Sequence, residues 1–163
     1  MTEIWDLVDK GGHKVGIKWE RANHASIPKG LYHPCVEVWV RVGDRMLIAR
    51  RHPDKSEGLK YDAPGGAVLS GEDMRDAAVR ELYEEVGISA PPESLEYLGA
   101  ITSKVGYAAS YLLRLDSLPK LSLQPGEVVG YRLVGRRELD EMIDELCKNC
   151  GKRYLVYRDR LFK

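Results

Sequence analysis

GGAVLSGEDMRDAAVRELYEEVGI, the segment from residue 65 to residue 88, contains the strongest helix signal of the chain. The helix is expected over residues 70–86, because Ser70 and Asp73 fit a capping box and acidic residues crowd the first turn. Gly87 follows at a position where glycine commonly ends a helix. Apolar side chains recur along one face, so this helix is expected to lie on a hydrophobic core.

Three glutamates crowd another face of the predicted helix. Glu81, Glu84 and Glu85 are spaced i, i+3 and i+4, which stacks their side chains, and Arg80 is expected to reach only Glu84. Like charges at these spacings destabilise a helix by roughly 0.2–0.5 kcal/mol per pair. A divalent cation would stabilise them, and hard oxygen ligands suit Mg²⁺ or Mn²⁺. A solvated acidic face is the competing interpretation, because surface helices are often rich in glutamate.

The same segment resembles the Nudix box. That motif is a glycine, five residues, a glutamate, seven residues, then Arg-Glu-apolar-any-Glu-Glu-any-Gly-apolar. Its nine specified positions are all matched within a frame of 23 residues, by Gly66, Glu72, Arg80, Glu81, Leu82, Glu84, Glu85, Gly87 and Ile88. The resemblance implies an α/β Nudix fold, which is an α/β/α sandwich with a mixed sheet. It also implies cleavage of a diphosphate linked to another moiety.

In that family the glutamates of the box hold a metal ion. The resemblance therefore implies that Glu81, Glu84 and Glu85 are metal ligands, with the Gly65 carbonyl as a further ligand. Bound Mg²⁺ or Mn²⁺ would neutralise phosphate oxygens and lower the pKa of a water that attacks phosphorus. Arg80 is expected to orient the glutamates through salt bridges.

A further group must accept the proton of the attacking water. Family members often use a glutamate on a loop before a late strand, and QPGEVVGYRLV places Glu127 there. Together with Arg80 and Glu84, Glu127 forms the expected catalytic set. An ordinary loop carboxylate is the alternative interpretation of Glu127.

Other positions are expected to bind substrate or to support the site. Arg50 and Arg51 end a predicted strand opposite the box and are expected to meet substrate phosphate, with a solvated strand end as the alternative. Gly66 and Gly87 are structural positions of the motif. Glu72 is expected to tie down the loop before the helix.

The flanking segments predict a mixed sheet and an N-terminal β-hairpin. Residues 1–33 form the hairpin and a loop, and residues 35–51 read as two strands joined by a turn. Further strands are expected over residues 94–103, 107–115 and 128–134, and a second helix over residues 136–149. The order of these elements indicates one α/β domain spanning residues 1–163.

The C-terminal residues 146–163 have no predicted role. Cys147 and Cys150 form a CxxC spacing there, but no second pair or suitable histidine follows to complete a zinc site. The two thiols are therefore interpreted as cysteines at the end of a helix.

The composition limits which classes of partner and which cellular location are expected. The chain has 163 residues, 25 basic and 25 acidic, so its net charge is zero. This balance argues against a general affinity for nucleic acid or anionic membrane. No run approaches the ~18 apolar residues of a membrane span, and three cysteines are too few for a disulfide framework. We expect a cytoplasmic protein whose partner is a small-molecule diphosphate; a homodimer is left open.

Four stretches outside the box, EIWDLVDKGGHKVG, GLYHPCVEVWV, LIARRHPDKSEG and GEVVGYRLV, resemble the Nudix subgroup related to isopentenyl-diphosphate isomerase. Those isomerases carry a catalytic cysteine and a metal-binding histidine in a Cys-Gly-His run, where this chain has Gly65, Gly66 and Ala67. His33 matches another isomerase ligand, but one histidine does not assemble that site. We therefore expect a hydrolase of a nucleoside diphosphate derivative or similar metabolite. An isomerase and a non-catalytic Nudix sensor domain are the alternatives.

Overall fold

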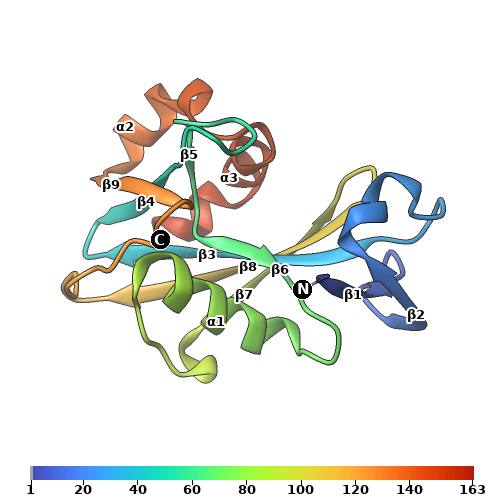
Figure 1. The fold of residues 1–163 in the computed structure, drawn as a ribbon. Coiled ribbons are helices and arrows are strands. Elements are labelled where there is room, and N and C mark those ends of the chain that lie inside the picture. The colour runs from blue at the N-terminus through green and yellow to red at the C-terminus, as the bar shows by residue number, and fades with distance from the viewer. Residues whose placement is uncertain (1) are drawn as a thin grey trace.

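Seven strands form the central sheet of the computed structural model, which describes residues 2–163 (Figure 1). They are β3 (His33–Val42), β4 (Arg45–Arg51), β5 (Tyr61–Asp62), β6 (Gly65–Ala67), β7 (Glu96–Thr102), β8 (Gly106–Leu115) and β9 (Val128–Val134). The order is β5-β4-β3-β8-β7, with β6 paired to β3 and β9 paired to β4. β3 and β8 run parallel and the other pairs are antiparallel, so the sheet is mixed as expected.

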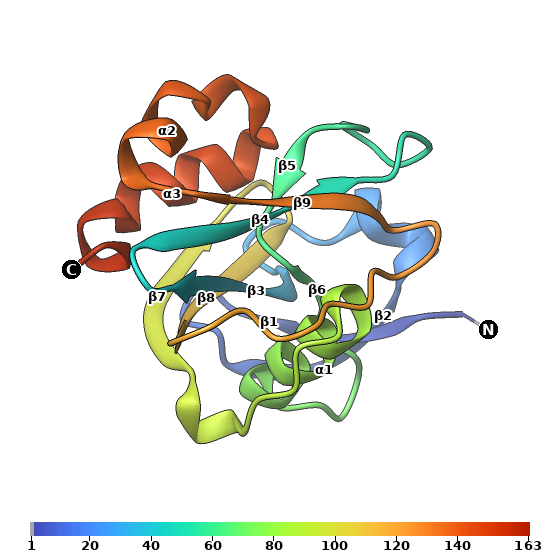
Figure 2. The same cartoon turned by 90° about the vertical axis from the view of Figure 1, so that its left-hand side faces the viewer.

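Helices cover both faces of this sheet (Figures 1 and 2). They are α1 (Met74–Val86) on one face, and α2 (Arg136–Glu141) and α3 (Lys148–Leu161) on the other. Three short 3₁₀ helices lie in the connections, η1 (Arg21–Ser26), η2 (Pro92–Ser94) and η3 (Ile143–Glu145). The predicted α/β/α sandwich is confirmed. Within residues 2–163, no helix is both long and apolar enough to cross a membrane.

The alternation of side chains along β3 builds the two cores. Val38 and Val40 pack on the α1 side, in a buried cluster that includes Leu82 of α1. Trp39 points the other way and packs beside Tyr154 of α3, with their ring centroids 5.9 Å apart. A strand buried on both faces is what a central strand between two helical layers requires.

The helix of the box begins later than the capping pattern suggested. Asp73 is its N-cap and accepts a hydrogen bond of 2.8 Å from the Arg75 amide, so α1 starts at Met74 and not at residue 70. The Ser70 hydroxyl is used elsewhere, donating to an Asp6 carboxylate oxygen at 2.8 Å. Gly87 ends the helix with φ 77°, the left-handed conformation in which glycine carries no penalty.

The second predicted helix, over residues 136–149, is wrong as one continuous element. The structure has α2, η3 and then α3 over this range. The Cys147 amide donates to the Tyr61 carbonyl at 2.8 Å and not to a carbonyl of the preceding turn, so the helix is interrupted at this residue. The helix then restarts, so residues 148–161 form α3 and cover the sheet. The C-terminal residues 146–163 thus contribute a helical layer, which the sequence analysis did not predict.

The predicted N-terminal hairpin is present as β1 (Ile4–Val8) paired to β2 (Lys14–Glu20). Trp5 and Leu7 are buried in a small cluster, and the Trp5 ring stacks on His33 with a centroid distance of 4.3 Å. The hairpin therefore packs beside the start of β3, close to the box loop.

Asp6 links the hairpin to the loop that precedes α1. Its carboxylate accepts hydrogen bonds from the Gly71 amide at 2.7 Å and from the Ser70 hydroxyl at 2.8 Å, and Lys18 lies 3.1 Å away. The Gly71 amide, followed by Ser70 and Lys18, holds the pKa of Asp6 well below its usual value. A carboxyl group with a depressed pKa stabilises the fold above its unfolded pKa, and this contribution is lost as pH falls toward the folded pKa.

Asp6→Asn is expected to lower the free energy of unfolding by on the order of 1–2 kcal/mol at pH 7, because hydrogen bonds to a charged acceptor are lost. The deficit should shrink at pH 3, below the unfolded pKa of about 3.9, where wild-type Asp6 begins to lose its charge benefit. Urea unfolding at both pH values measures this. Asp44→Asn is the control, since Asp44 is exposed and its side chain makes no hydrogen bond or ion pair within residues 2–163. An equal deficit at both pH values would contradict the assignment.

Candidate active site

Arg80 organises the acidic face of α1. Its Nε and Nη2 atoms bind the two carboxylate oxygens of Glu72 at 2.5 and 3.0 Å. Its Nη1 atom lies 2.8 Å from Glu81 and 3.2 Å from Glu84. The expectation that Arg80 reaches only Glu84 is therefore wrong, because the guanidinium extends along the helix toward the loop that carries Glu72. One cation compensates three carboxylates.

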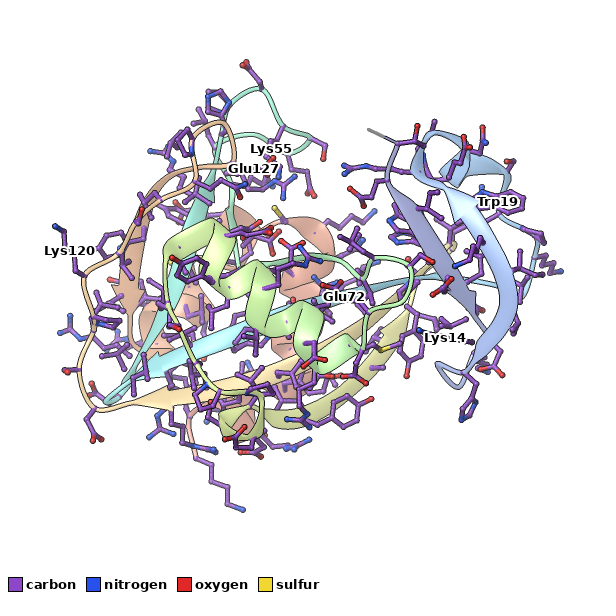
Figure 3. The ribbon with its side chains drawn as sticks, turned by 60° about the horizontal axis from the view of Figure 1, so that its bottom comes forward. Lys14, Trp19, Lys55, Glu72, Lys120 and Glu127 are labelled. Atoms are coloured by element: carbon purple, nitrogen blue, oxygen red, sulfur yellow. The ribbon has the colours of Figure 1, made fainter. Side chains whose placement is uncertain are left out.

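Glu72 ties the box loop to the helix (Figure 3). Besides its two contacts with Arg80, it accepts a hydrogen bond of 2.9 Å from the Leu69 amide. Arg80 also donates to the Ala67 carbonyl at 3.0 Å. These bonds hold the chain between β6 and α1 in one conformation.

The two glycines of β6 allow the backbone to approach the glutamates. A Cβ at Gly66 would lie 2.5 Å from the Glu81 carboxylate carbon, and one at Gly65 would lie 2.1 Å from the Val36 carbonyl oxygen. The Gly65 amide donates to Glu85 at 3.2 Å. No side chain fits at either position without moving its neighbours, which gives a physical reason for both glycines.

Two of the box carboxylates, Glu81 and Glu85, are buried without enough nearby positive charge to offset the cost of burial. Burial raises the pKa of Glu85 to about 8, against the weaker opposing effect of the Gly65 amide. Burial also raises the pKa of Glu81, and Arg80 opposes that shift. A divalent cation would supply the missing positive charge, and carboxylate and carbonyl oxygens are the ligands that Mg²⁺ and Mn²⁺ prefer. The types of donor atom present therefore fit such an ion, but the box glutamates do not bring three ligand atoms within 4.8 Å of one another in the part of the chain that the structure describes.

Two adjoining cavities meet at this site. The glutamate cavity, of about 640 Å³, is lined by Glu81, Glu84 and Glu85 and by residues of the N-terminal hairpin. The α3-side cavity, of about 500 Å³, extends toward Arg153 on the opposite helical layer. Their shared lining includes Lys55, Gly65, Glu85 and Glu127. A ligand can therefore span from the glutamates of α1 to the α3 layer.

Glu127 lies where the two cavities join. Its carboxylate makes an ion pair with the ammonium group of Lys55, which comes from the loop between β4 and β5 (Figure 3). Burial lowers the pKa of Lys55. Lys55 could not be singled out from the sequence, because a lysine in a polar loop has no spacing signal that distinguishes it from a solvated side chain.

Arg50 and Arg51 line the α3-side cavity and not the glutamate cavity. Arg51 lies 3.3 Å from Asp62 and donates to the Ser56 carbonyl at 2.9 Å. Arg50 donates to the Leu59 carbonyl at 3.1 Å. Both arginines hold the loop between β4 and β5 while facing the cavity.

A second acidic cluster lies between the sheet and α3, and sequence reasoning missed it. Ligand atoms of Glu37, Asp62 and Cys150 lie within 4.8 Å of one another. Arg153 Nε is 2.8 Å from a Glu37 oxygen, so a side chain of the protein already supplies positive charge there. The only sequence signal was Glu37, a carboxylate within the apolar strand segment CVEVWV.

The CxxC cysteines are buried in the core under α3. Cys147 is the N-cap of α3, and burial raises its pKa to about 12. Burial also raises the pKa of Cys150. Raised pKa values disfavour the thiolate form, which is the reactive form of a cysteine.

Comparisons with known proteins show the family of this chain. The family model of the NUDIX domain matches residues 31–150. The Streptomyces coelicolor protein "Uncharacterized Nudix hydrolase SCO1686" is 32% identical over 154 residues, covering 88% of this chain and 80% of that protein. Bovine "Isopentenyl-diphosphate Delta-isomerase 1" is 27% identical over 175 residues, covering 88% of this chain and 74% of that protein. The crystal structure of DR0079 from Deinococcus radiodurans superposes with a TM-score of 0.76 at 25% identity, over 96% of this chain and 98% of that one. The chain belongs to the Nudix hydrolase family.

Proposed function

We propose that this protein hydrolyses the diphosphate linkage of a nucleoside diphosphate derivative or a similar metabolite, using Mg²⁺ or Mn²⁺. The observation that carries the proposal is the set of carboxylates Glu81, Glu84 and Glu85, which line a cavity of about 640 Å³ and of which Glu81 and Glu85 are buried with raised pKa values. These side chains and the Gly65 carbonyl would hold the ion. When bound, it neutralises phosphate oxygens and lowers the pKa of an attacking water.

The protein groups around that ion have separate roles. Arg80 holds Glu81 and Glu84 in position through its Nη1 contacts, and Glu72 fixes Arg80 in turn. Glu127 accepts the proton of the attacking water, and its ion pair with Lys55 keeps its carboxylate at the junction of the two cavities. A positioned base of this kind contributes roughly 10²–10⁴-fold to a rate.

Arg50 and Arg51 would contact the substrate from the α3-side cavity that they line. Their side chains are already held by loop carbonyls, so little side-chain entropy is lost when they bind an anion.

A panel of nucleoside diphosphate derivatives and isoprenoid diphosphates, incubated with Mg²⁺ and separated by ion-exchange chromatography, tests this function. We expect nucleoside diphosphate derivatives to be cleaved and EDTA to abolish the cleavage. Binding without turnover of any diphosphate would instead favour the sensor alternative.

The isomerase alternative is disfavoured by the backbone at residue 65. A Cβ at residue 65 would lie 2.1 Å from the Val36 carbonyl oxygen, so this position cannot accommodate a cysteine unless β3 moves. Incubation with isopentenyl diphosphate in D₂O is therefore expected to give neither dimethylallyl diphosphate nor deuterium at carbon. Mass spectrometry measures both products, with a metal-free reaction as control. Either product above that control would support the isomerase alternative.

A further inference from the structure

Arg153 enters the α3-side cavity from the helical layer opposite to the box. Its side chain is 16% exposed, and its Nε atom lies 2.8 Å from an oxygen of Glu37, which is only 4% exposed. The other Glu37 oxygen accepts hydrogen bonds from the Trp39 indole at 2.9 Å and the Ser110 hydroxyl at 2.6 Å. Two neighbours thus fix Glu37 through one oxygen, and its other oxygen forms an ion pair with Arg153 Nε that lacks hydrogen-bond geometry.

This arrangement leaves donors of Arg153 available. A guanidinium group carries five N–H donors, and only the Nε side faces Glu37. Within residues 2–163, the ion pair with Glu37 is the only polar contact of Arg153, and its buried Nε atom has no hydrogen-bond partner. A buried ion pair is weak evidence of a stabilising role, because replacing such a pair by apolar side chains is often neutral or stabilising. A rigid, partly unused guanidinium in a cavity wall is suited to a ligand that offers acceptors.

Most charges of the α3-side cavity are paired, whereas the positive charge of Arg50 has no carboxylate partner within residues 2–163. Its ion pairs are Glu37 with Arg153, Asp62 with Arg51, and Glu127 with Lys55. Of its other charged groups, Arg21 pairs with Glu3, Arg50 donates to a carbonyl and Glu85 belongs to the candidate metal site. Next to Arg153, the neighbouring carboxylates of Glu37 and Asp62 would repel a second phosphate, whereas they would not repel a neutral polar group. A hydrocarbon chain would desolvate these ion pairs without replacing any hydrogen bond.

A nucleobase meets these conditions. It is neutral and planar, and its edge offers acceptors for a guanidinium fork and N–H donors for a carboxylate. Asp62 supplies such a carboxylate, with an oxygen within 4.8 Å of Glu37, and its side chain is 24% exposed. Apolar lining from Val36, Ala49 and Val128 covers the remaining surface. The cavity volume of about 500 Å³ suits a small-molecule ligand.

We propose that the α3-side cavity binds the base of a nucleoside diphosphate derivative, with Arg153 donating to a base acceptor and Asp62 accepting from a base N–H group. This inference deepens the proposed function and rests on it for the position of the diphosphate, at the junction with the glutamate cavity. Arg153 is accordingly a specificity residue contributed by α3.

Isothermal titration calorimetry with nucleoside monophosphates in the presence of Mg²⁺ tests the base pocket without turnover, because these ligands have no diphosphate linkage. Wild-type protein is expected to bind GMP or CMP at least about 5-fold more tightly than ribose 5-phosphate, which has the sugar and phosphate but no base. Arg153→Lys keeps the charge beside Glu37 but removes the planar fork. It should weaken binding of the monophosphate by about 5- to 100-fold, the range of one bidentate base contact.

Arg158→Lys is the matched control, because Arg158 lies on the same helix, pairs with Asp140 at 3.5 Å and lines neither cavity. It should leave all affinities unchanged. If Arg153→Lys fails to fold, the wild-type comparison of GMP and CMP with ribose 5-phosphate decides in its place.

Equal wild-type affinity for GMP, CMP and ribose 5-phosphate, or unchanged affinity in folded Arg153→Lys, would overturn the base pocket. Tighter binding of isopentenyl diphosphate than of GDP and CDP would overturn it as well. The two proposals fail separately. Hydrolysis without base discrimination removes only the pocket, and base-dependent binding without hydrolysis of any diphosphate removes only the proposed function.

Discussion

Glu84→Gln and Glu85→Gln are each expected to lower kcat by on the order of 10²-fold or more, and the double variant should lose more than either single variant. Glutamine keeps the shape of the side chain but removes the charge that a divalent cation needs. The fold should survive, because these carboxylates repel one another and burial disfavours the charge of Glu85. The melting temperature of the double variant should therefore equal or exceed that of wild type.

The measurement is kcat as a function of Mg²⁺ concentration, with circular dichroism to follow unfolding. Glu93→Gln is the control, since Glu93 is exposed in η2 and lines neither cavity. It should leave kcat unchanged. Retained turnover in the double variant at ordinary Mg²⁺ concentration would contradict the proposal that glutamates of α1 bind the metal.

Glu127→Gln is expected to lower kcat by roughly 10²–10⁴-fold while leaving Mg²⁺ affinity nearly unchanged, as loss of a general base would. The glutamates of the box supply the main ligands, so the metal should remain bound. The acidic limb of the pH–rate profile should shift or vanish with the substitution, because the proton acceptor is gone.

Titrating Mg²⁺ against rate in this variant separates a base from a ligand. Weaker Mg²⁺ binding, with recovery of rate at high Mg²⁺, would make Glu127 a metal ligand. A rate equal to wild type at every Mg²⁺ concentration would leave Glu127 a bystander, and the base would then be sought among Glu81, Glu84 and Glu85. Glu93→Gln serves again as the unchanged reference.

The elements that sequence alone predicted are those built from local spacing. The acidic and apolar faces of α1, its end at Gly87 and the N-terminal hairpin follow from periodicity and turn residues, which act over a few positions along the chain. The candidate metal ligands could be named for the same reason, since Glu81, Glu84 and Glu85 share a face of one helix. Their place in one cavity agrees with that reading, and their roles stay predictions.

The tertiary structure decided what depends on contacts between distant segments. The break between α2 and α3 depends on the Cys147 amide meeting the Tyr61 carbonyl, and the start of α1 on Ser70 binding Asp6. No local pattern contains these partners.

The same holds for the α3 side of the site. Glu37 and Arg153 are 116 positions apart (153 − 37), and the parallel pairing of β3 with β8 sets the register that places Ser110 beside Glu37. Helix and strand propensities are properties of neighbouring residues, whereas a charge pair across layers exists only after the layers have packed. The box and its glutamates could therefore be predicted from the chain itself, and the polar α3-side cavity could not, because its residues converge only in the folded protein.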